Sequence, residues 1–304
     1  MRTMLPTGVP DPDTHAVALS ITDAEFHRFR RLVHEQTGIA LNDGKRPLLC
    51  ARLGKRLRRW GYGTFSEYWM HLTERDPHGE ELMRMVNAIT TNKTDFFRES
   101  HHFEILRDHV ATIAGRAGAD APRTLRLWSA GCSSGEEPYS MALTVLDTLS
   151  RPGSWDVRIL ASDIDTEILA TAAAGVYAEE RVEAVPADLR RRYFLKGRGS
   201  QSGFVRVRPE VRELVTFRRI NLREDTWPIR SALDAIFCRN VLIYFDRELQ
   251  QQLAARFVDL LKPGGVLFLG HSESLVGMRP GLEHLGNTAY RKVAPERSPG
   301  RTAP

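Results

Sequence analysis

Two glycines and a group of acidic residues follow a short apolar stretch in the middle of the chain. Residues 125–140 read LRLWSAGCSSGEEPYS, which predicts a buried strand, a turn with Gly131 and Gly135, and a helix start. A second apolar strand, ILASD, ends at Asp163. Glycines let a backbone approach a ligand, and an acid after the next strand receives ribose hydroxyls. The G-x-x-x-G spacing differs from the G-x-G-x-x-G of pyrophosphate binders and favours a cofactor with adenosine but no phosphate.

The acids near this turn each have two interpretations. Asp163 would bind ribose hydroxyls or cap the following helix, and Asp165 suits that cap better. Glu136 and Glu137 would stabilise a helix N-terminus by about 0.3–1 kcal/mol. Alternatively, one of them would face a cationic ligand group such as an ammonium or a sulfonium, and spacing alone does not choose between the two.

A third polar segment, CRNVLIYFD, begins at Cys238, where another apolar strand ends. Arg239 and Asn240 would line the same crevice, and Tyr244 would present its hydroxyl or its ring. Phe245 is interpreted as a core aromatic. Asn240 is not followed by Pro-Pro-Tyr, so the N-P-P-Y motif of amide and adenine methylation is absent. No G-x-S-x-G or P-loop motif occurs, which disfavours serine hydrolases and P-loop nucleoside triphosphatases.

The composition is ordinary for a soluble globular protein. The 304 residues are 42% hydrophobic and 27% charged, enough for one large or two modest domains. No apolar run approaches the roughly 18 residues of a membrane span, and we expect no signal peptide. Three scattered cysteines suit a reducing cytoplasm. The ten histidines form no metal-binding motif, so we expect no metal and interpret His101, His102 and His271 as structural or capping residues.

The net charge of +5 is modest but unevenly distributed. Residues 45–59 include seven basic residues and no acid, and Arg52, Lys55 and Arg59 fall on one helical face. Such a face indicates an anionic partner, which could be nucleic acid, anionic lipid or an acidic protein surface.

The periodicity of apolar residues divides the chain into a helical part and an α/β part. Helices are expected at 22–38, 45–60, 65–73, 78–89 and 101–114. Strands are then expected at 125–129, 157–162, 234–238 and 266–269, with helices at 136–149, 166–174 and 247–261. This alternation predicts a parallel sheet with helices on both faces. Residues 193–222 predict inserted antiparallel strands, of which the last, through Ile220, belongs either to the insertion or to the main sheet.

Five segments together resemble the chemotaxis receptor protein-glutamate O-methyltransferases, the CheR family. They are NAITTNKTDFFRE, WSAGCSSGEEPYS, ASDID, DAIFCRNVLIYFD and LLKPGGVLFLGHSES, within residues 20–293. Each segment is moderately specific, and all five in this order are highly specific.

The resemblance implies an α/β, Rossmann-like SAM-dependent methyltransferase domain with an inserted small antiparallel β-subdomain, preceded by an all-α N-terminal domain. The implied divisions are a flexible N-terminus (1–19), a receptor-docking helical domain (20–90), a linker and helix reaching the cofactor (91–123), the methyltransferase domain (124–294, β-subdomain at about 190–218) and a flexible tail (295–304). The implied reaction moves methyl from S-adenosyl-L-methionine to chemoreceptor glutamates, giving methyl esters and S-adenosyl-L-homocysteine for sensory adaptation.

The resemblance also implies roles for individual residues. The implied cofactor-binding residues are Asn92, Thr94, Arg98, Glu137, Asp163, Asn221, Leu222, Cys238, Arg239 and Asn240. It chooses Glu137 over Glu136, and it assigns Asp163 to the ribose. Tyr244 would lie near the transferred methyl, and Arg98 would position the incoming carboxylate or the cofactor. A glutamate carboxyl, with a pKa of about 4.3, is already ionised at neutral pH, so no general base is expected.

The implied partners are the acidic methylation helices of transmembrane chemoreceptors. They would dock on Arg52, Lys55, Arg56 and Arg59. The turn at 197–203 resembles that of family members that tether a receptor's C-terminal pentapeptide by strand addition. We expect a cytoplasmic monomer that is recruited to receptor arrays and binds no nucleic acid.

Two alternatives remain beside this interpretation. A nucleic-acid methyltransferase is disfavoured because no stacking aromatics accompany the basic residues. A non-catalytic binding scaffold is disfavoured because Asp163, Asn240 and Tyr244 are intact.

Overall fold

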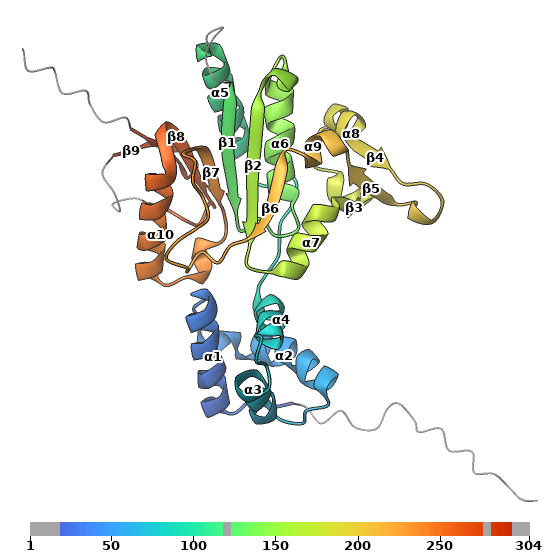
Figure 1. The fold of residues 1–304 in the computed structure, drawn as a ribbon, viewed down its shortest axis with the longest axis vertical. Helices are drawn as coiled ribbons and strands as arrows, with labels where there is room; N and C mark the ends of the chain where they lie inside the picture. The colour runs from blue at the N-terminus through green and yellow to red at the C-terminus, as the bar shows by residue number, and fades with distance from the viewer. Residues whose placement is uncertain (1–18, 118–122, 276–280, 294–304) are drawn as a thin grey trace, which may run out of the picture.

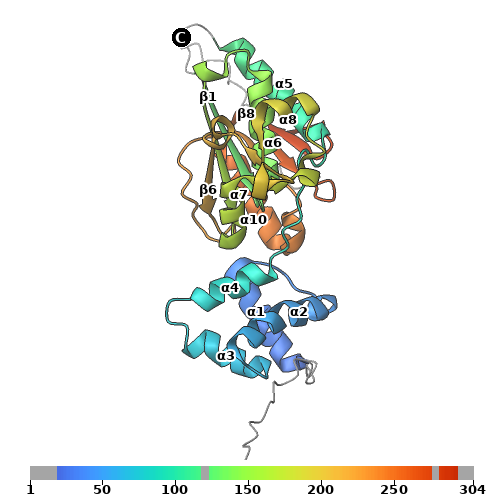
Figure 2. The ribbon, with the colours of Figure 1, turned by 90° about the vertical axis from the view of Figure 1, so that its right-hand side faces the viewer.

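The computed structural model describes residues 19–117, 123–275 and 281–293. A bundle of four helices lies at one end of the molecule and an α/β domain at the other, as two views at right angles show (Figures 1 and 2). In the described part of the chain, no helix combines the length and apolar character that crossing a membrane requires.

The helical bundle follows the expected apolar periodicity. Its helices are α1 (Asp23–Thr37), α2 (Arg46–Trp60), α3 (Phe65–Glu74) and α4 (Glu80–Ile89), with a 3₁₀ turn η1 (Asp43–Lys45). Thr22 and Glu25 form a capping box at the start of α1, and Gly38 ends the helix with a φ of 77°. The bundle has its own hydrophobic core, in which Phe29 packs edge-on against Phe65.

The main sheet has seven strands in the order β6-β2-β1-β7-β8-β10-β9. They are β1 (Thr124–Ala130), β2 (Asp156–Asp163), β6 (Val215–Arg219), β7 (Leu233–Cys238), β8 (Leu261–Leu269), β9 (Leu282–Gly286) and β10 (Ala289–Lys292). The first five strands in this order pair in parallel, as expected. The sheet is nevertheless mixed, because β10 runs antiparallel to β8 and to β9. This edge pair was absent from the strands expected from sequence.

Alternating side chains of the central strands pack against helices on opposite faces of the sheet. Leu127 and Phe237 belong to the core formed with α5 (His101–Arg116) and α6 (Glu136–Thr148). Trp128 and Ile236, one residue away in each strand, belong to the core formed with α10 (Arg247–Leu260). Helix α7 (Thr166–Ala174) follows β2 and has the predicted bounds.

A small antiparallel sheet projects from the α/β domain (Figure 1). Its strand order is β3-β5-β4, with β3 (Val176–Ala178), β4 (Phe194–Lys196) and β5 (Phe204–Val207). Around it lie η3 (Glu179–Val182), α8 (Ala187–Tyr193), η4 (Gly199–Gln201) and α9 (Pro209–Arg212). Strand β6 pairs with β2, so the segment that ends at Ile220 joins the main sheet. The small sheet also includes β3, which precedes the 190–218 range expected for it. The remaining 3₁₀ turns are η2 (Pro152–Ser154) and η5 (Leu242–Tyr244).

Candidate active site

A cavity of about 450 Å³ lies between the helical bundle and the carboxyl ends of the parallel strands. Its walls come from the segments after β1, β2, β6 and β7, from the linker at 90–98, and from residues 37–48 of the bundle. In open α/β sheets this edge is where ligands bind. The helical bundle therefore closes a crevice that would otherwise be open to solvent.

The cavity brings together the predicted cofactor-binding and catalytic residues, with one exception. Those that line it are Asn92, Thr94, Arg98, Glu137, Asp163, Asn221, Leu222, Arg239, Asn240 and Tyr244. Cys238 does not line it, because its side chain is buried in the apolar core on the α10 side. Burial there raises the pKa of the Cys238 thiol, which makes the sulfur unreactive.

Gly131 lines the cavity, and a larger residue at this position would force the neighbouring Val241 to move. Its φ is +82°, and an added Cβ would lie 2.4 Å from Cγ2 of Val241. Gly135, with a φ of +96°, plays a packing role, because a Cβ there would lie 2.9 Å from Ala172 and from the hydroxyl of Tyr177. Both positions of the G-x-x-x-G motif therefore require glycine. At Gly131 the backbone lies close to Val241 in the cavity wall, and at Gly135 it lies close to Ala172 and Tyr177.

Asp163 presents a buried carboxylate at the end of β2. Its Oδ2 accepts the backbone N–H of Ser133 (2.9 Å), and its Oδ1 accepts the N–H of Asp165 (3.0 Å). Burial raises the pKa of Asp163, although these backbone hydrogen bonds oppose the shift. Each carboxylate oxygen keeps a second acceptor site, which suits a pair of hydroxyl groups. The helix cap is Asp165, which accepts the N–H groups of Glu167 and Ile168.

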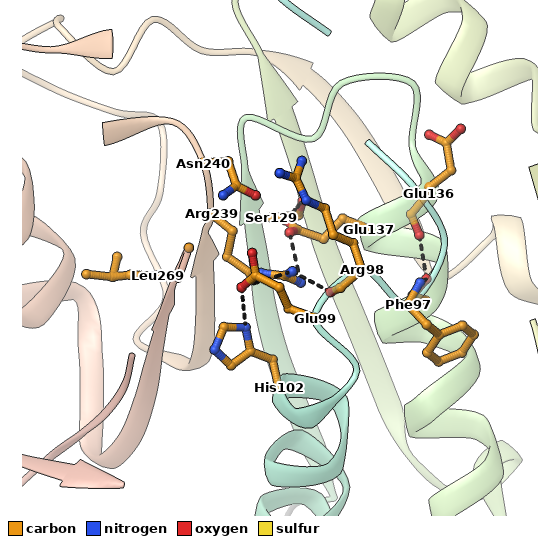
Figure 3. A network of polar contacts seen from close by, with 12 residues as sticks. Phe97, Arg98, Glu99, His102, Ser129, Glu136, Glu137, Arg239, Asn240 and Leu269 are labelled. Atoms are coloured by element: carbon orange, nitrogen blue, oxygen red, sulfur yellow. Dashed lines mark hydrogen bonds and ion pairs between the residues drawn. The ribbon is translucent and has the colours of Figure 1, made fainter. Parts of the chain in front are cut away.

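The adjacent glutamates point in different directions (Figure 3). The Glu137 carboxylate lines the cavity and accepts the Ser129 hydroxyl at 2.7 Å. The Glu136 carboxylate accepts the Ser134 hydroxyl at 2.6 Å and pairs with Arg181 near the small sheet. Burial raises the pKa of both carboxyls. Of the two, Glu137 is placed to meet a cationic ligand group.

Arg239, which lines the cavity, also lies close to two carboxylates (Figure 3). Its side chain is only 2% exposed, and its guanidinium lies 3.6 Å from Oε2 of Glu137 and 3.5 Å from Oε2 of Glu99. It also donates to the carbonyl of Arg98. Sequence reasoning missed Glu99 and Ser129, although Glu99 lies inside the quoted segment that ends FFRE.

The backbone around Arg98 adopts an unusual conformation. Phe97 and Glu99 have φ values of 53° and 56°, which costs a non-glycine residue about 1–3 kcal/mol each. The Phe97 N–H donates to Oγ of Ser140 at 3.0 Å, and this bond helps to hold the turn. The Arg98 guanidinium donates to the carbonyl of Lys93 at 3.0 Å and lines the cavity. Two left-handed residues thus present one arginine to the ligand space.

Asn240 is held by a buried glutamate that the sequence analysis did not assign. Its φ is 59°, and its N–H donates to Oε2 of Glu273 at 2.9 Å. The same carboxylate accepts the N–H groups of Gly270 (2.7 Å) and Ile243 (3.1 Å). Glu273 belongs to the GHSES segment, and it fixes the loop that leads to Tyr244.

The helical bundle is attached to this loop and to the segment after β6. Ala40 donates its N–H to the Tyr244 carbonyl at 2.8 Å, and Ile39 forms a bridge with Phe245. The Asn221 side chain donates to the Gln36 carbonyl at 2.7 Å. Asn221 therefore contributes to the domain contact as well as to the cavity wall.

The linker is fixed through the cap of α7. The Asn92 side chain donates to Oδ2 of Asp165 at 2.7 Å, and the Thr90 hydroxyl donates to the same oxygen at 3.2 Å. One acid thus joins the helix after β2 to the segment that carries Thr94 and Arg98.

The basic face of α2 divides into two groups. Arg52 donates to the carbonyls of Ile89 and Thr90, both at 2.5 Å. Arg56 pairs with the buried Glu81, with Nε at 2.8 Å from Oε1. These two guanidiniums stabilise the bundle, whereas the remaining predicted docking residues, Lys55 and Arg59, are exposed.

The donor set of the cavity fits S-adenosylmethionine. The acidic residues Asp95, Glu137 and Asp163 line it, and Gly131 allows a ligand to approach the backbone closely. Five parallel strands with this glycine turn and these acids are typical of a Rossmann-like methyltransferase domain, which is here covered by a helical domain.

Comparison with known proteins identifies the family. The model of the CheR methyltransferase SAM-binding domain matches residues 92–291, and that of the CheR methyltransferase all-alpha domain matches residues 24–90. The chain therefore belongs to the CheR methyltransferase family, and it is a SAM-dependent methyltransferase. The fold class and the cofactor expected from sequence are confirmed.

Curated relatives match over nearly the whole chain. Chemotaxis protein methyltransferase 2 of Pseudomonas aeruginosa is 46% identical over 288 residues, covering 94% of this chain and 99% of the relative. The chemotaxis protein methyltransferase of Escherichia coli is 43% identical over 273 residues, covering 90% and 92%.

Proposed function

We propose that this enzyme methylates glutamate side chains of chemoreceptors and releases S-adenosylhomocysteine. The observation that carries the proposal is that Glu137, Asp163 and Arg98 line one cavity at the sheet edge. When bound, S-adenosylmethionine supplies a methyl group that the substrate carboxylate oxygen attacks as the carbon–sulfur bond breaks, leaving the electron pair on sulfur. Family membership and the curated relatives support the receptor as substrate.

The residues that hold the cofactor follow from charge and hydrogen-bonding capacity. Asp163 accepts the two ribose hydroxyls through its free acceptor sites, and Glu137 binds the cationic methionine end. From the linker, Asn92 and Thr94 contact the cofactor. The remaining wall of the cofactor site is formed by Asn221, Leu222, Arg239, Asn240 and the backbone of Cys238.

The reaction needs orientation more than proton transfer. The substrate carboxylate is ionised at neutral pH, since a free glutamate has a pKa of about 4.3. Arg98, presented by the left-handed turn, attracts that carboxylate, and Tyr244 borders the path of the methyl group. Positioning of this kind is worth up to about 7–11 kcal/mol of the barrier.

Receptor docking uses the exposed part of the α2 basic face. Lys55 and Arg59 attract the acidic methylation helices, while Arg52 and Arg56 hold the bundle. An outer strand of the small sheet, such as β4 with its exposed Leu195, accepts a receptor pentapeptide by strand addition. The enzyme acts as a cytoplasmic monomer recruited to receptor arrays.

The test is methyl transfer from labelled S-adenosylmethionine to receptor-containing membranes. We expect labelled receptor whose label base treatment releases as methanol, because methyl esters hydrolyse in base. Arg98→Ala should lose most of the transfer rate, whereas Arg75→Ala, an exposed residue at the end of α3, serves as the matched control. A base-stable product, or label in nucleic acid, would defeat the assignment.

A further inference from the structure

The side chains of His102 and Glu99 point toward each other (Figure 3), and Nδ1 of the first and Oε2 of the second are both buried. Nε2 of His102 contacts the carbonyl oxygen of Asn287, which can only accept, so this nitrogen carries the hydrogen. In the neutral ring, Nδ1 then holds a lone pair. It lies 3.5 Å from Oε2 of Glu99. Among the described residues, neither of these two atoms has a hydrogen-bond partner.

Burial makes this arrangement costly unless something positive lies between the two atoms. The His102 side chain is 0% exposed and that of Glu99 is 11% exposed. The Arg239 guanidinium lies 3.5 Å from Oε2 of Glu99 but forms no hydrogen bond with it, so a cation or donor between Oε2 and Nδ1 would satisfy both atoms.

The separation of the two atoms suits a metal ion. Ligand atoms about 2.1 Å from zinc at a tetrahedral angle lie roughly 3.4 Å apart. His101 offers a third ligand, because one atom each from Glu99, His101 and His102 lie within 4.8 Å of one another. His271 binds Oε1 of Glu99 with Nδ1 at 3.2 Å, and thus orients the carboxylate from behind.

The local charge also favours a cation. Arg239 is the guanidinium shared by Glu99 and Glu137, at 3.5 Å and 3.6 Å. Arg239 therefore only partly compensates the charge of Glu99, because it shares its guanidinium with Glu137. Two imidazoles and a carboxylate form the N/O donor set that zinc and its neighbours in the first transition series prefer.

We propose that Glu99, His101 and His102 form a binding site for a divalent cation of the zinc class. Glu99 directly follows Arg98 and has a left-handed backbone. A metal ion on its carboxylate fixes the turn that presents Arg98 to the cavity. The sequence predicts no metal site because these residues match no spaced ligand motif, and the fold alone brings their ligand atoms together.

The test is equilibrium dialysis of the tag-free full chain against ZnCl₂ after removal of metals with a chelator. We expect one zinc per chain, and His101→Gln should weaken binding at least about tenfold. His101 is half-buried, so its variant should fold, which a circular dichroism melt checks. His78→Gln, an exposed histidine away from the cluster, is the matched control and should bind like the parent.

A second readout distinguishes a built site from loose surface binding. Co²⁺ in place of zinc should give the intense visible absorption of a four-coordinate ion, and Glu99→Gln should abolish it. The proposal is overturned if the parent binds no stoichiometric zinc, or if His101→Gln and His78→Gln bind it equally. In either case Glu99, His101 and His102 do not form a metal site.

Discussion

Glu136 and Glu137 are neighbours in sequence but belong to different parts of the molecule. Helix α6 turns about 100° per residue, so one carboxylate reaches the cavity and the other reaches Arg181 near the small sheet. Their shared burial raises the pKa of both, yet only Glu137 is placed to bind a ligand. The pair therefore offers a matched experiment.

Glu137→Gln should weaken S-adenosylhomocysteine binding by about 10- to 100-fold. The amide keeps the Ser129 hydrogen bond but loses the charge, and a charge-assisted bond is worth about 1.5–3 kcal/mol. Glu136→Gln should leave the Kd within about twofold, because its carboxylate does not line the cavity. Isothermal titration calorimetry measures both. Equal losses in the two variants would contradict the assignment of Glu137.

Asp163→Asn should lower both stability and cofactor affinity. The carboxylate accepts the N–H groups of Ser133 and Asp165, and an amide nitrogen would face one of these donors. Leaving one buried donor unpaired costs about 1–3 kcal/mol, which a urea unfolding curve detects. Unchanged stability together with unchanged Kd would argue against this role.

At the scale of elements, the basic residues of helix α2 have two roles: some stabilise the bundle, and others are exposed for the proposed receptor docking. Arg56 and Tyr68 both bond the buried Glu81, with Tyr68 at 2.7 Å. Burial alone would raise the pKa of Glu81, but the hydrogen bonds from Arg56 and Tyr68 outweigh it and hold the pKa below its usual value.

Arg56→Ala should destabilise the enzyme by about 3 kcal/mol, because it leaves a buried carboxylate without its partner. Arg59→Ala on the same helix should leave the midpoint of unfolding unchanged and lower receptor methylation, more so at low salt. Chemical denaturation and a methylation assay at two salt concentrations check the pair. If Arg56→Ala unfolds at the parent's midpoint, the structural role is wrong.

The Glu81 interaction also predicts a pH dependence. Since the folded pKa is below the unfolded value of about 4.3, its stabilisation is fully present above that pH. It is lost as pH falls through the folded pKa. The stability difference between the parent and Glu81→Gln should therefore be largest near neutral pH and shrink below about pH 4. A difference that grows on acidification would have the wrong sign for this pair.

The elements themselves were largely predictable, because caps and periodicity are local. Helix α7 has the predicted bounds, and Thr22 and Gly38 delimit α1 as their residue types indicate. Pairing between distant segments was not predictable in this way. The sequence of β3 does not reveal that it pairs with β5, nor does the helical periodicity of α2 show that Arg52 reaches the end of α4.

In the candidate site, too, local features could be predicted from sequence and contacts between segments could not. Acids and glycines at strand ends point to a cavity because the fold class places strand ends together. The supporting residues Glu99 and Glu273 could not be assigned, because they act through contacts between segments far apart in the chain. Ser129 contacts Glu137 only eight residues away, but the turn between them sets that contact, and the residue types alone do not show it.

At the scale of the whole molecule, ligand binding should tighten the contact between the two domains. Residues 37–48 and 90–98 line the same cavity as the sheet edge. Saturating S-adenosylhomocysteine at 100 times its Kd should stabilise the fold by about 2.7 kcal/mol. Hydrogen exchange should slow in both segments but not in α3, which lies away from the cavity. Protection confined to the sheet edge would contradict a ligand held between the domains.

The most direct test of the account is mass spectrometry of receptor peptides after reaction with S-adenosylmethionine that carries a trideuterated methyl group. We predict the deuterated methyl on glutamate side chains of the receptor's cytoplasmic helices, with transfer strongly reduced by Arg98→Ala and by Glu137→Gln. A methyl group found on another residue type, or transfer unaffected by both substitutions, would contradict it.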